Sequence, residues 1–212
     1  MKISNGMKKL VIFDFDGVLA DTEEFCYKIH KDVNKTLTWQ EWQDFCNGNF
    51  IEGIVNASRE DRPYIIPSDF TQRYKDEIEK INVHNALHEV ILSLKINYQI
   101  AVVSSTSGNL ISNFLKKENL FNYFSDILGV EIDANKTTKI NFLLKKYNLK
   151  PNDVIFITDT LGDILEAEKS DVKLIGVTWG LHDRKTLEKG NPITIIDDPR
   201  DLESAVNNAL VP

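Results

Sequence analysis

Cysteine is scarce in this sequence, and it occurs in no metal-binding or disulfide pattern. Cys26 and Cys46 are the only two cysteines among 212 residues, they form no CxxC motif, and no histidine is spaced as a partner. These absences argue against a zinc site and a disulfide framework, and we expect two free thiols in a reducing compartment. The four histidines are scattered, so we expect them at the surface or packed in the interior.

An excess of basic residues and long apolar runs are missing too. The chain has 25 Lys and Arg against 32 Asp and Glu, a formal net charge of -7, which disfavours a nucleic-acid partner. No apolar stretch approaches the length of a membrane span, and residues 1–9 are too short and polar for a signal peptide. We therefore expect a cytoplasmic protein with no nucleic-acid or membrane partner, while its oligomeric state stays open.

Three common motifs of nucleotide and ester chemistry are also absent. The sequence contains no GxGxxG after a strand, no GxxxxGKS/T and no GxSxG. Dinucleotide binding, P-loop nucleotide hydrolysis and a serine nucleophile elbow therefore lack support.

Short apolar strands alternate with amphipathic helices over most of the chain. Leu10 to Phe13 is a compact apolar run of the kind that forms a buried strand. Further along we expect strands at 99–103, 126–129, 154–157, 173–177 and 194–196. We expect helices at 86–94, 109–117, 138–147, 161–169, 184–189 and 200–210. This alternation predicts an α/β fold with a doubly wound parallel sheet and helices on both faces.

Residues 22–83 differ from the rest, because no buried strand occurs among them and aromatic residues recur at helical spacing. A capping box that begins at Thr38 opens one helix, and residues 67–81 form a second amphipathic pattern. We therefore predict a small all-helical cap at 22–83, inserted into a core made of 1–21 and 84–212.

Polar side chains follow three of the expected strands. Asp14 and Asp16 follow the first strand, Ser104 follows the second, and Asp159 follows the strand at 154–157. The carboxyl ends of parallel strands share one edge of the sheet, which is where such folds bind ligands. We expect these side chains to meet there and to form the functional site.

The segment Asp14-Phe15-Asp16-Gly17 places two carboxylates on one side of an extended backbone, and Gly17 allows a sharp turn after them. At a separation of ~4 Å and an effective dielectric of ~20 the two charges repel by ~4 kcal/mol. A hard divalent cation such as Mg2+ offsets that repulsion, and a shared proton is the alternative. The motif alone is as typical of an acidic turn after a strand.

Further candidates lie near the same edge. Asp159 and Asp163 are four residues apart across a strand-to-helix junction, where an acid also serves as a helix cap. Ser104, Ser105 and Thr106 end a strand and open a helix, so their hydroxyls and free amides suit a phosphate group, although a plain helix cap is the common use.

In their order along the chain, these residues resemble the four motifs of the haloacid dehalogenase-like superfamily. The first motif, residues 14–22, is highly specific, and Ser104, Lys136 and the pair Asp159 and Asp163 follow at the family's spacing. Stretches near the C-terminus look like the phosphoglycolate phosphatase and beta-phosphoglucomutase branch. The resemblance implies a Rossmann-like core with a helical cap inserted after the first motif.

The resemblance also implies the chemistry of the acidic residues. Asp14 would attack phosphorus and form an aspartyl phosphate, and Asp16 would act as general acid and then as general base. Mg2+ would be held by Asp14, the backbone carbonyl of Asp16 and Asp159, with Asp163 supporting the site.

Phosphoryl binding would fall to Ser104 and Lys136, and Ser105 is a further candidate. Lys136 suits the spacing of the third motif better than Lys139, although the Lys-Pro form common in this branch is absent. Thr158 replaces the glycine that often precedes the fourth-motif aspartate, a change that tightens the turn.

The predicted function is a magnesium-dependent phosphomonoester hydrolase that acts on a small phosphorylated metabolite. Asp16 favours phosphate chemistry over dehalogenation, which needs no acid at that position. Cys26 stands where a sugar phosphomutase carries a histidine, so hydrolysis is preferred. A phosphomutase and a non-catalytic phosphate-binding or signalling relative remain as alternatives.

The sequence does not identify the substrate. Specificity is expected from the cap, where the turn at 48–50, Arg59 and Arg62 are candidates to meet an anionic substrate group. Loop and solvent-facing positions are the more common use of such residues.

Overall fold

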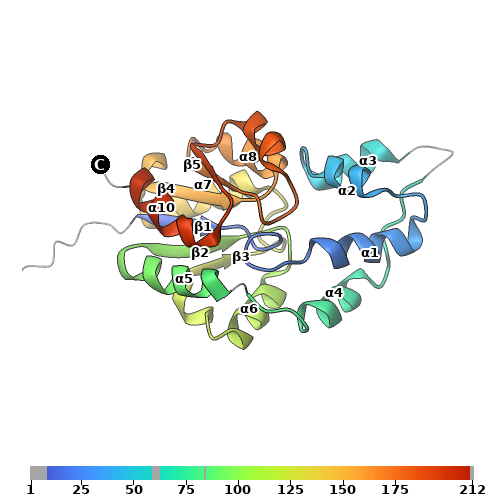
Figure 1. The fold of residues 1–212 in the computed structure, drawn as a ribbon, viewed down its shortest axis with the longest axis horizontal. Coiled ribbons are helices and arrows are strands. Elements are labelled where there is room, and N and C mark those ends of the chain that lie inside the picture. The colour runs from blue at the N-terminus through green and yellow to red at the C-terminus, as the bar shows by residue number, and fades with distance from the viewer. Residues whose placement is uncertain (1–8, 59–62, 84, 211–212) are drawn as a thin grey trace, which may run out of the picture.

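The computed structural model describes residues 9–58, 63–83 and 85–210, and its centre is a six-stranded parallel sheet (Figure 1). The strands are β1 (Leu10–Phe13), β2 (Gln99–Val103), β3 (Asp126–Leu128), β4 (Val154–Thr158), β5 (Lys173–Val177) and β6 (Thr194–Ile196). Their order across the sheet is β3-β2-β1-β4-β5-β6. The chain builds outward from β1 to one edge and then to the other, which confirms the predicted doubly wound Rossmann-like sheet.

The helices fall into two groups. The first group lies between β1 and β2 in the chain and comprises α1 (Glu23–Val33), α2 (Trp39–Phe45), α3 (Phe50–Ala57), α4 (Phe70–Ile78) and α5 (Asn85–Asn97). The second group alternates with strands and comprises α6 (Gly108–Lys117), α7 (Lys136–Tyr147), α8 (Leu161–Glu168), α9 (Arg184–Leu187) and α10 (Leu202–Leu210). Short 3-10 turns occupy Phe121–Tyr123, Pro151–Asp153, Glu188–Gly190 and Pro199–Asp201.

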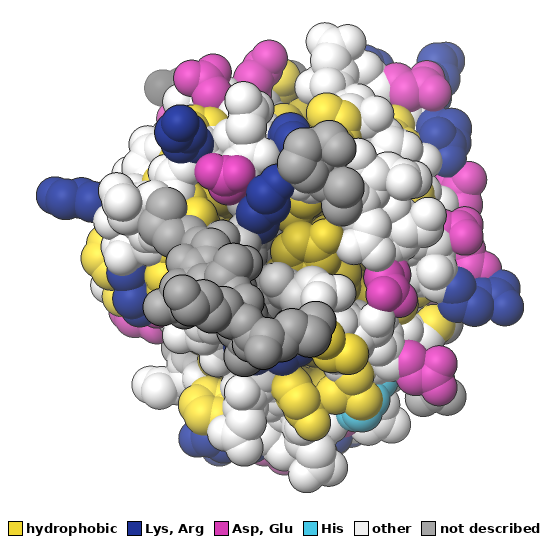
Figure 2. Space-filling view, turned by 90° about the vertical axis from the view of Figure 1, so that its left-hand side faces the viewer, with side chains coloured by type: hydrophobic (Ala, Val, Ile, Leu, Met, Phe, Trp, Pro, Cys, Tyr) yellow, Lys and Arg dark blue, Asp and Glu magenta, His cyan; other side chains and the backbone are white. Residues whose placement is uncertain are grey.

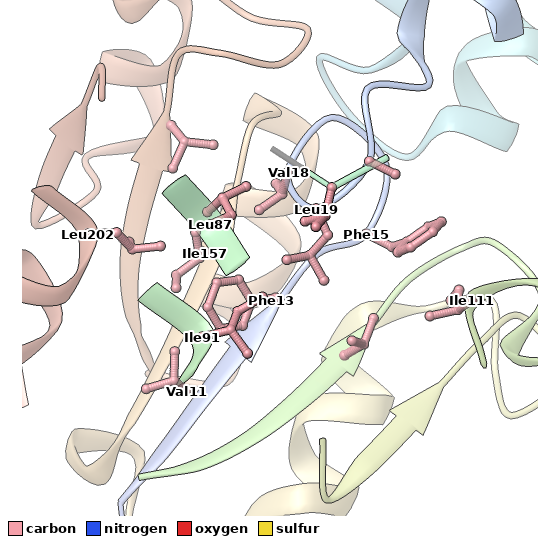
Figure 3. Packing of buried hydrophobic residues seen from close by; sticks show 14 of the residues in the cluster. Val11, Phe13, Phe15, Val18, Leu19, Leu87, Ile91, Ile111, Ile157 and Leu202 are labelled. Atoms are coloured by element: carbon pink, nitrogen blue, oxygen red, sulfur yellow. The ribbon is translucent and has the colours of Figure 1, made fainter. Parts of the chain in front are cut away.

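Side chains of β1 alternate between two apolar clusters, one on each face of the sheet. Val11 and Phe13 belong to the first cluster and Leu10 and Ile12 to the second, and all four are fully buried. Figure 3 shows Val11 and Phe13 lying against α5. Burial of each such side chain stabilises the fold by about 1.5–3 kcal/mol, so the central strand is firmly held.

The two clusters also show which helices cover each face. Apolar residues of α5, α6 and α10 pack in the first cluster, and those of α7, α8 and α9 pack in the second. Helices cover both faces of the sheet, so a ligand reaches it at the ends of the strands. Asp14 follows the carboxyl end of β1. The fold therefore places the predicted site at that edge.

Helices α1 to α4, here called the helical segment, lie to one side of the sheet in Figure 1. The predicted capping box opens α2, because Thr38 Oγ1 accepts the Glu41 amide at 3.2 Å and Glu41 Oε2 accepts the Thr38 amide at 2.8 Å. The boundaries of the cap at residues 22 and 83 stay a prediction.

Most predicted elements are present, and their boundaries shift by a few residues. Helix α7 begins at Lys136, two residues early, because the Asn135 side chain accepts the Thr138 amide and caps it there. Helix α4 begins at Phe70 and not at 67, since a turn closed by the Phe70 amide on the Pro67 carbonyl precedes it.

Two expectations from composition concern the cysteines and membrane-spanning segments. Both cysteines are free, as predicted. In the part of the chain that the structure describes, no helix combines the length and apolar character needed to cross a membrane. Figure 2 views the side away from the helical segment, where basic and acidic side chains are intermixed.

Leu143 and Phe142 are neighbours on α7 with opposite surroundings, since Leu143 is fully buried in the second cluster and Phe142 is 48% exposed. We expect Leu143→Ala to lower the free energy of unfolding by about 2–5 kcal/mol, because it leaves a cavity in the core. Phe142→Ala, the control on the same helix, should change it by less than about 1 kcal/mol. Urea unfolding followed by circular dichroism measures both, and equal losses would contradict the assignment of the helix faces.

Candidate active site

The carboxyl ends of β1, β2 and β4 border a cavity of about 350 Å³. Asp14 follows β1, Ser104 follows β2 and Asp159 follows β4, and all three side chains are buried and line this cavity. The other predicted site residues line it as well, namely Asp16, Ser105, Lys136 and Asp163. Residues far apart in the sequence therefore meet at the edge where the strand order predicted a site.

The ammonium of Lys136 lies between the carboxylates of Asp14 and Asp163. Its Nζ donates to Oδ2 of Asp14 at 2.6 Å and also donates to Oδ2 of Asp163. The side chains of Lys136 and Asp14 are each only 5% exposed. Oδ1 of Asp14 accepts the backbone N–H of Phe15 at 2.7 Å, so both carboxylate oxygens of Asp14 are held.

Burial and charge act in opposite directions on this cluster. Burial lowers the pKa of Lys136, but the Asp14 and Asp163 carboxylates outweigh it and the pKa rises above its usual value. Burial raises the pKa of Asp163, yet the Lys136 charge and hydrogen bonds bring it down to about 2. The pKa of Asp14 stays well above its usual value, because burial and Asp163 exceed the attraction of Lys136. One ammonium thus neutralises one carboxylate, and Asp14 lacks a cation of its own.

The Asp159 carboxylate fits between two glycines. Gly17 has φ +70, and a Cβ there would lie 2.0 Å from Oδ2 of Asp159. A Cβ on Gly180 would lie 2.3 Å from the same oxygen. The backbone N–H of Leu181 donates to this oxygen at 2.8 Å. Any larger residue at either glycine would therefore displace the carboxylate.

The other oxygen of Asp159 is buried and has no hydrogen-bond partner among the described residues. Burial raises the pKa of Asp159 to about 7, with Asp163 adding to the shift and the Leu181 amide opposing it. Asp14, Asp159 and Asp163 have one ammonium among them, which Asp14 and Asp163 share, so one positive charge faces three carboxylates. A hard divalent cation with oxygen ligands, such as Mg2+, fits both the free oxygen and the missing charge.

Four hydroxyl groups hold the carboxylate of Asp16. Thr22 and Tyr74 donate to Oδ1 at 2.8 and 2.6 Å. Thr106 donates to Oδ2 at 2.7 Å, and Ser104 lies at 3.4 Å from the same oxygen. These hydroxyls stabilise the negative charge of Asp16 and fix the direction in which its carboxylate points.

The carboxylates of the four predicted metal-binding aspartates do not surround one point, and the expected arrangement does not require it, since it uses only the backbone carbonyl of Asp16 and gives Asp163 a supporting role. Across the described ranges, no three acidic, histidine or cysteine side chains stand around a common point as metal ligands. The reason is that the Asp16 carboxylate is turned to hydroxyls and the Asp163 carboxylate to Lys136. The side chains of Asp14 and Asp159 remain as the carboxylates suited to a cation.

The structure separates the two candidate lysines. Lys136 contacts Asp14, whereas Lys139 donates to the backbone carbonyl of Ser104 at 2.6 Å and so supports the loop after β2. Ser105 lies three residues before α6, and the first amide of that helix, on Gly108, is bound by Glu131. Ser105 lines the cavity from the loop between β2 and α6.

Several residues of the site were not singled out from the sequence. Tyr74 lies in the amphipathic pattern at 67–81, which indicated only a helix, yet its hydroxyl reaches Asp16. His182, expected either at the surface or packed in the interior, is buried, and its Nδ1 accepts the Leu161 amide at 2.9 Å. The turn at 48–50 lines the cavity, as suggested, whereas Arg59 and Arg62 lie outside the described residues.

Lys136→Met would remove the ammonium and leave two acids in the cluster without a cation. We expect the free energy of unfolding in chelator to fall by about 3–5 kcal/mol, the cost of breaking a buried ion pair from one side. Lys145→Met, an exposed lysine on the same helix, is the control and should change it by less than about 1 kcal/mol. Chemical denaturation measures both, and a loss no larger than that of the control would contradict the cluster.

The chain matches a described protein family and named relatives along most of its length. Residues 11–177 match the model of the family described as haloacid dehalogenase-like hydrolase. A pyrophosphatase from Bacillus mycoides is 22% identical over 205 residues and covers 91% of this chain and 94% of its own length. A phosphoglycolate phosphatase from Vibrio parahaemolyticus is 23% identical over 220 residues, with 93% and 96% covered.

Solved structures agree in fold. A haloacid dehalogenase-like family protein from Streptococcus pneumoniae superposes with a TM-score of 0.77 at 18% identity, over 94% of this chain and 99% of the other. A hydrolase from Pseudomonas syringae gives 0.78 at 20% identity, over 95% and 99%. Because the family model spans most of the chain and the predicted motifs meet in one cavity, this protein belongs to the haloacid dehalogenase-like hydrolases.

Proposed function

We propose that the protein is a magnesium-dependent phosphomonoester hydrolase that acts on a small phosphorylated metabolite through an aspartyl-phosphate intermediate. The observation that carries the proposal is the convergence of Asp14, Asp16, Lys136 and Asp159 on one cavity. The relatives named for pyrophosphate and phosphoglycolate support phosphate chemistry. Predicted site residues and family motifs thus point to the same reaction.

Asp14 acts as the nucleophile in the first step. One of its carboxylate oxygens attacks phosphorus, and the bond between phosphorus and the leaving oxygen breaks as Asp16 gives that oxygen a proton. Lys136, bound to Oδ2 of Asp14, orients the carboxylate and offsets negative charge on the phosphoryl group. Ser104 and Ser105, which line the same cavity, bind the remaining phosphoryl oxygens.

In the second step a water molecule attacks phosphorus and gives its proton to Asp16. The bond between phosphorus and the Asp14 oxygen breaks, inorganic phosphate leaves, and both aspartates return to their starting state. The hydroxyls of Thr22, Tyr74 and Thr106 position Asp16 for these transfers.

The donor set suits Mg2+. Asp14, the backbone carbonyl of Asp16 and Asp159 would hold it, while Asp163 supports the site through Lys136 and the Thr158 hydroxyl at 3.0 Å. When bound, Mg2+ supplies positive charge that attracts the phosphate oxygens and stabilises charge in the transition state.

Cys26 supports hydrolysis over phosphomutase chemistry. The thiol lines the cavity, and burial, with Asp16 and Glu23 adding, holds its pKa well above the usual value. A thiol that stays neutral does not replace the histidine that a sugar phosphomutase carries at this position. The proposed acceptor of the phosphoryl group is therefore water.

Asp14→Asn should abolish turnover of phosphate esters, by at least about a thousandfold, because an amide does not attack phosphorus. Phosphate release from an aryl phosphate ester with Mg2+ measures the effect, and thermal melting checks that the variant is folded. Asp201→Asn, at an exposed acid, is the control and should keep full activity. Undiminished activity in folded Asp14→Asn would refute the assignment of Asp14 as the nucleophile.

The pH dependence of stability provides a second test. The pKa of Asp159 is raised to about 7 and that of Asp14 well above its usual value, so the folded chain holds protons there that the unfolded chain has already lost. Between about pH 4 and pH 7 the folded state therefore binds more protons, and its stability falls as pH rises. We expect the melting midpoint in chelator to drop over this range.

Mg2+ should reverse the drop of the melting midpoint that we expect at higher pH. At 100 times its dissociation constant, a ligand bound only by the folded state adds about 2.7 kcal/mol, which raises the midpoint by roughly 5–10 °C for a chain of this size. The control Asp159→Asn should lose most of the Mg2+ shift, flatten the pH profile and melt no lower than the metal-free parent. A parent without any Mg2+ shift at pH 8 would rule out the proposed site.

A further inference from the structure

The cavity that contains Asp14 also borders the helical segment, and its wall there is largely aromatic. This wall, here called the aromatic wall, consists of His30, Trp42, Phe50, Phe70 and Tyr74. The ring centroid of His30 lies 5.0 Å from those of Trp42 and Phe70, and Phe70 lies 5.8 Å from Tyr74. Rings packed in this way present a fixed apolar surface to a ligand.

His30 adds no positive charge to the aromatic wall. Its Nδ1 lies 2.7 Å from the hydroxyl oxygen of Tyr64, and the residue is only 4% exposed. Burial lowers the pKa of His30 to about 4, so the ring is uncharged at neutral pH. At neutral pH this side of the cavity therefore offers no cation from His30 to an anionic group.

The charged groups that line the cavity are mostly acidic. Among the described residues that line it, Lys136 is the one cation, and its ammonium is already bound to Asp14 and Asp163. Glu23 adds a carboxylate close to Asp159, because both approach Gly17. A Cβ on Gly17 would lie 3.0 Å from Oε1 of Glu23 and 2.0 Å from Oδ2 of Asp159. A second anionic group on a substrate would therefore find no free cation among these described lining residues.

Some apolar side chains that line the cavity are also exposed to solvent. Ile66 and Val130 line it and are 64% and 47% exposed. Solvent-exposed aliphatic side chains at the edge of an aromatic wall favour an apolar ligand over a charged one.

We infer that the leaving group of the substrate is an aromatic or bulky apolar alcohol without a second anionic group. The inference rests on the proposed function, because it describes the leaving-group side of the same cavity. It sets this chain apart from the relatives named for phosphoglycolate and pyrophosphate, since those compounds carry a carboxylate or a second phosphate beside the reacting one.

Benzyl phosphate and phosphoglycolate make a matched test, because both are esters of a CH2–O–P unit that carries either a phenyl ring or a carboxylate. Ethyl phosphate supplies the small neutral reference. We expect kcat/KM for benzyl phosphate to exceed that for phosphoglycolate by at least about tenfold, with ethyl phosphate between them. Phosphate release with Mg2+ measures all three, and pyrophosphate is added as a second anionic substrate.

Variants test whether the aromatic wall is responsible. Phe70→Leu should lower kcat/KM for benzyl phosphate by about three- to tenfold relative to ethyl phosphate, the worth of one ring contact. Phe25→Leu is the control, because Phe25 packs 5.3 Å from the Tyr74 ring but is not among the residues that line the cavity. The control should keep the ratio of the two substrates within about twofold.

The outcomes separate the inference from the proposed function. A higher kcat/KM for phosphoglycolate or pyrophosphate than for benzyl phosphate would overturn the inference. It would not contradict the proposed hydrolase function. No release from any ester by the parent enzyme would overturn the proposed function and the inference with it. If Phe70→Leu and Phe25→Leu change the preference for benzyl phosphate equally, the aromatic wall does not cause that preference.

Discussion

The buried ammonium of Lys136 is the interaction on which the rest of the site depends. It joins Asp14, at the end of β1, to Asp163 on α8, and thereby ties the first strand of the chain to an element far along it. Parallel strands deliver their polar ends to one edge, so acids gathered there repel one another unless a cation lies among them. Lys136 meets part of that need, and the raised pKa values of Asp14 and Asp159 show that the repulsion is not fully offset.

Much of this arrangement could be predicted from local sequence. The apolar run before Asp14 marks a buried strand whatever surrounds it, and the capping box at Thr38 is complete within four residues. Alternating strands and helices limit the topology to a few solutions, so the strand ends that carry Ser104 and Asp159 had to share an edge with Asp14. Each of these inferences rests on a pattern that neighbouring residues define by themselves.

Other features depend on contacts that the sequence does not display. The hydroxyl of Tyr74 reaches Asp16 across 58 residues of chain, and Gly180 leaves room for Asp159 only because a distant loop passes there. The separation of Asp16 from the other aspartates follows from hydroxyls on three segments, and no spacing rule specifies them. For the same reason the recurring aromatic residues of 22–83 indicated only helices, although several of their rings also line the cavity.

The place of β1 in the sheet has a consequence for how the molecule forms. Leu10 pairs with Gln99 on one side and with Val154 on the other, so the first strand completes its hydrogen bonds only with segments made much later. Contacts of such long range require loop closure before they add stability, and they make folding slow. A nascent chain thus exposes β1, the strand that precedes Asp14, until most of its partners have emerged. Refolding should regain native-like helix content well before it regains the geometry of the cavity.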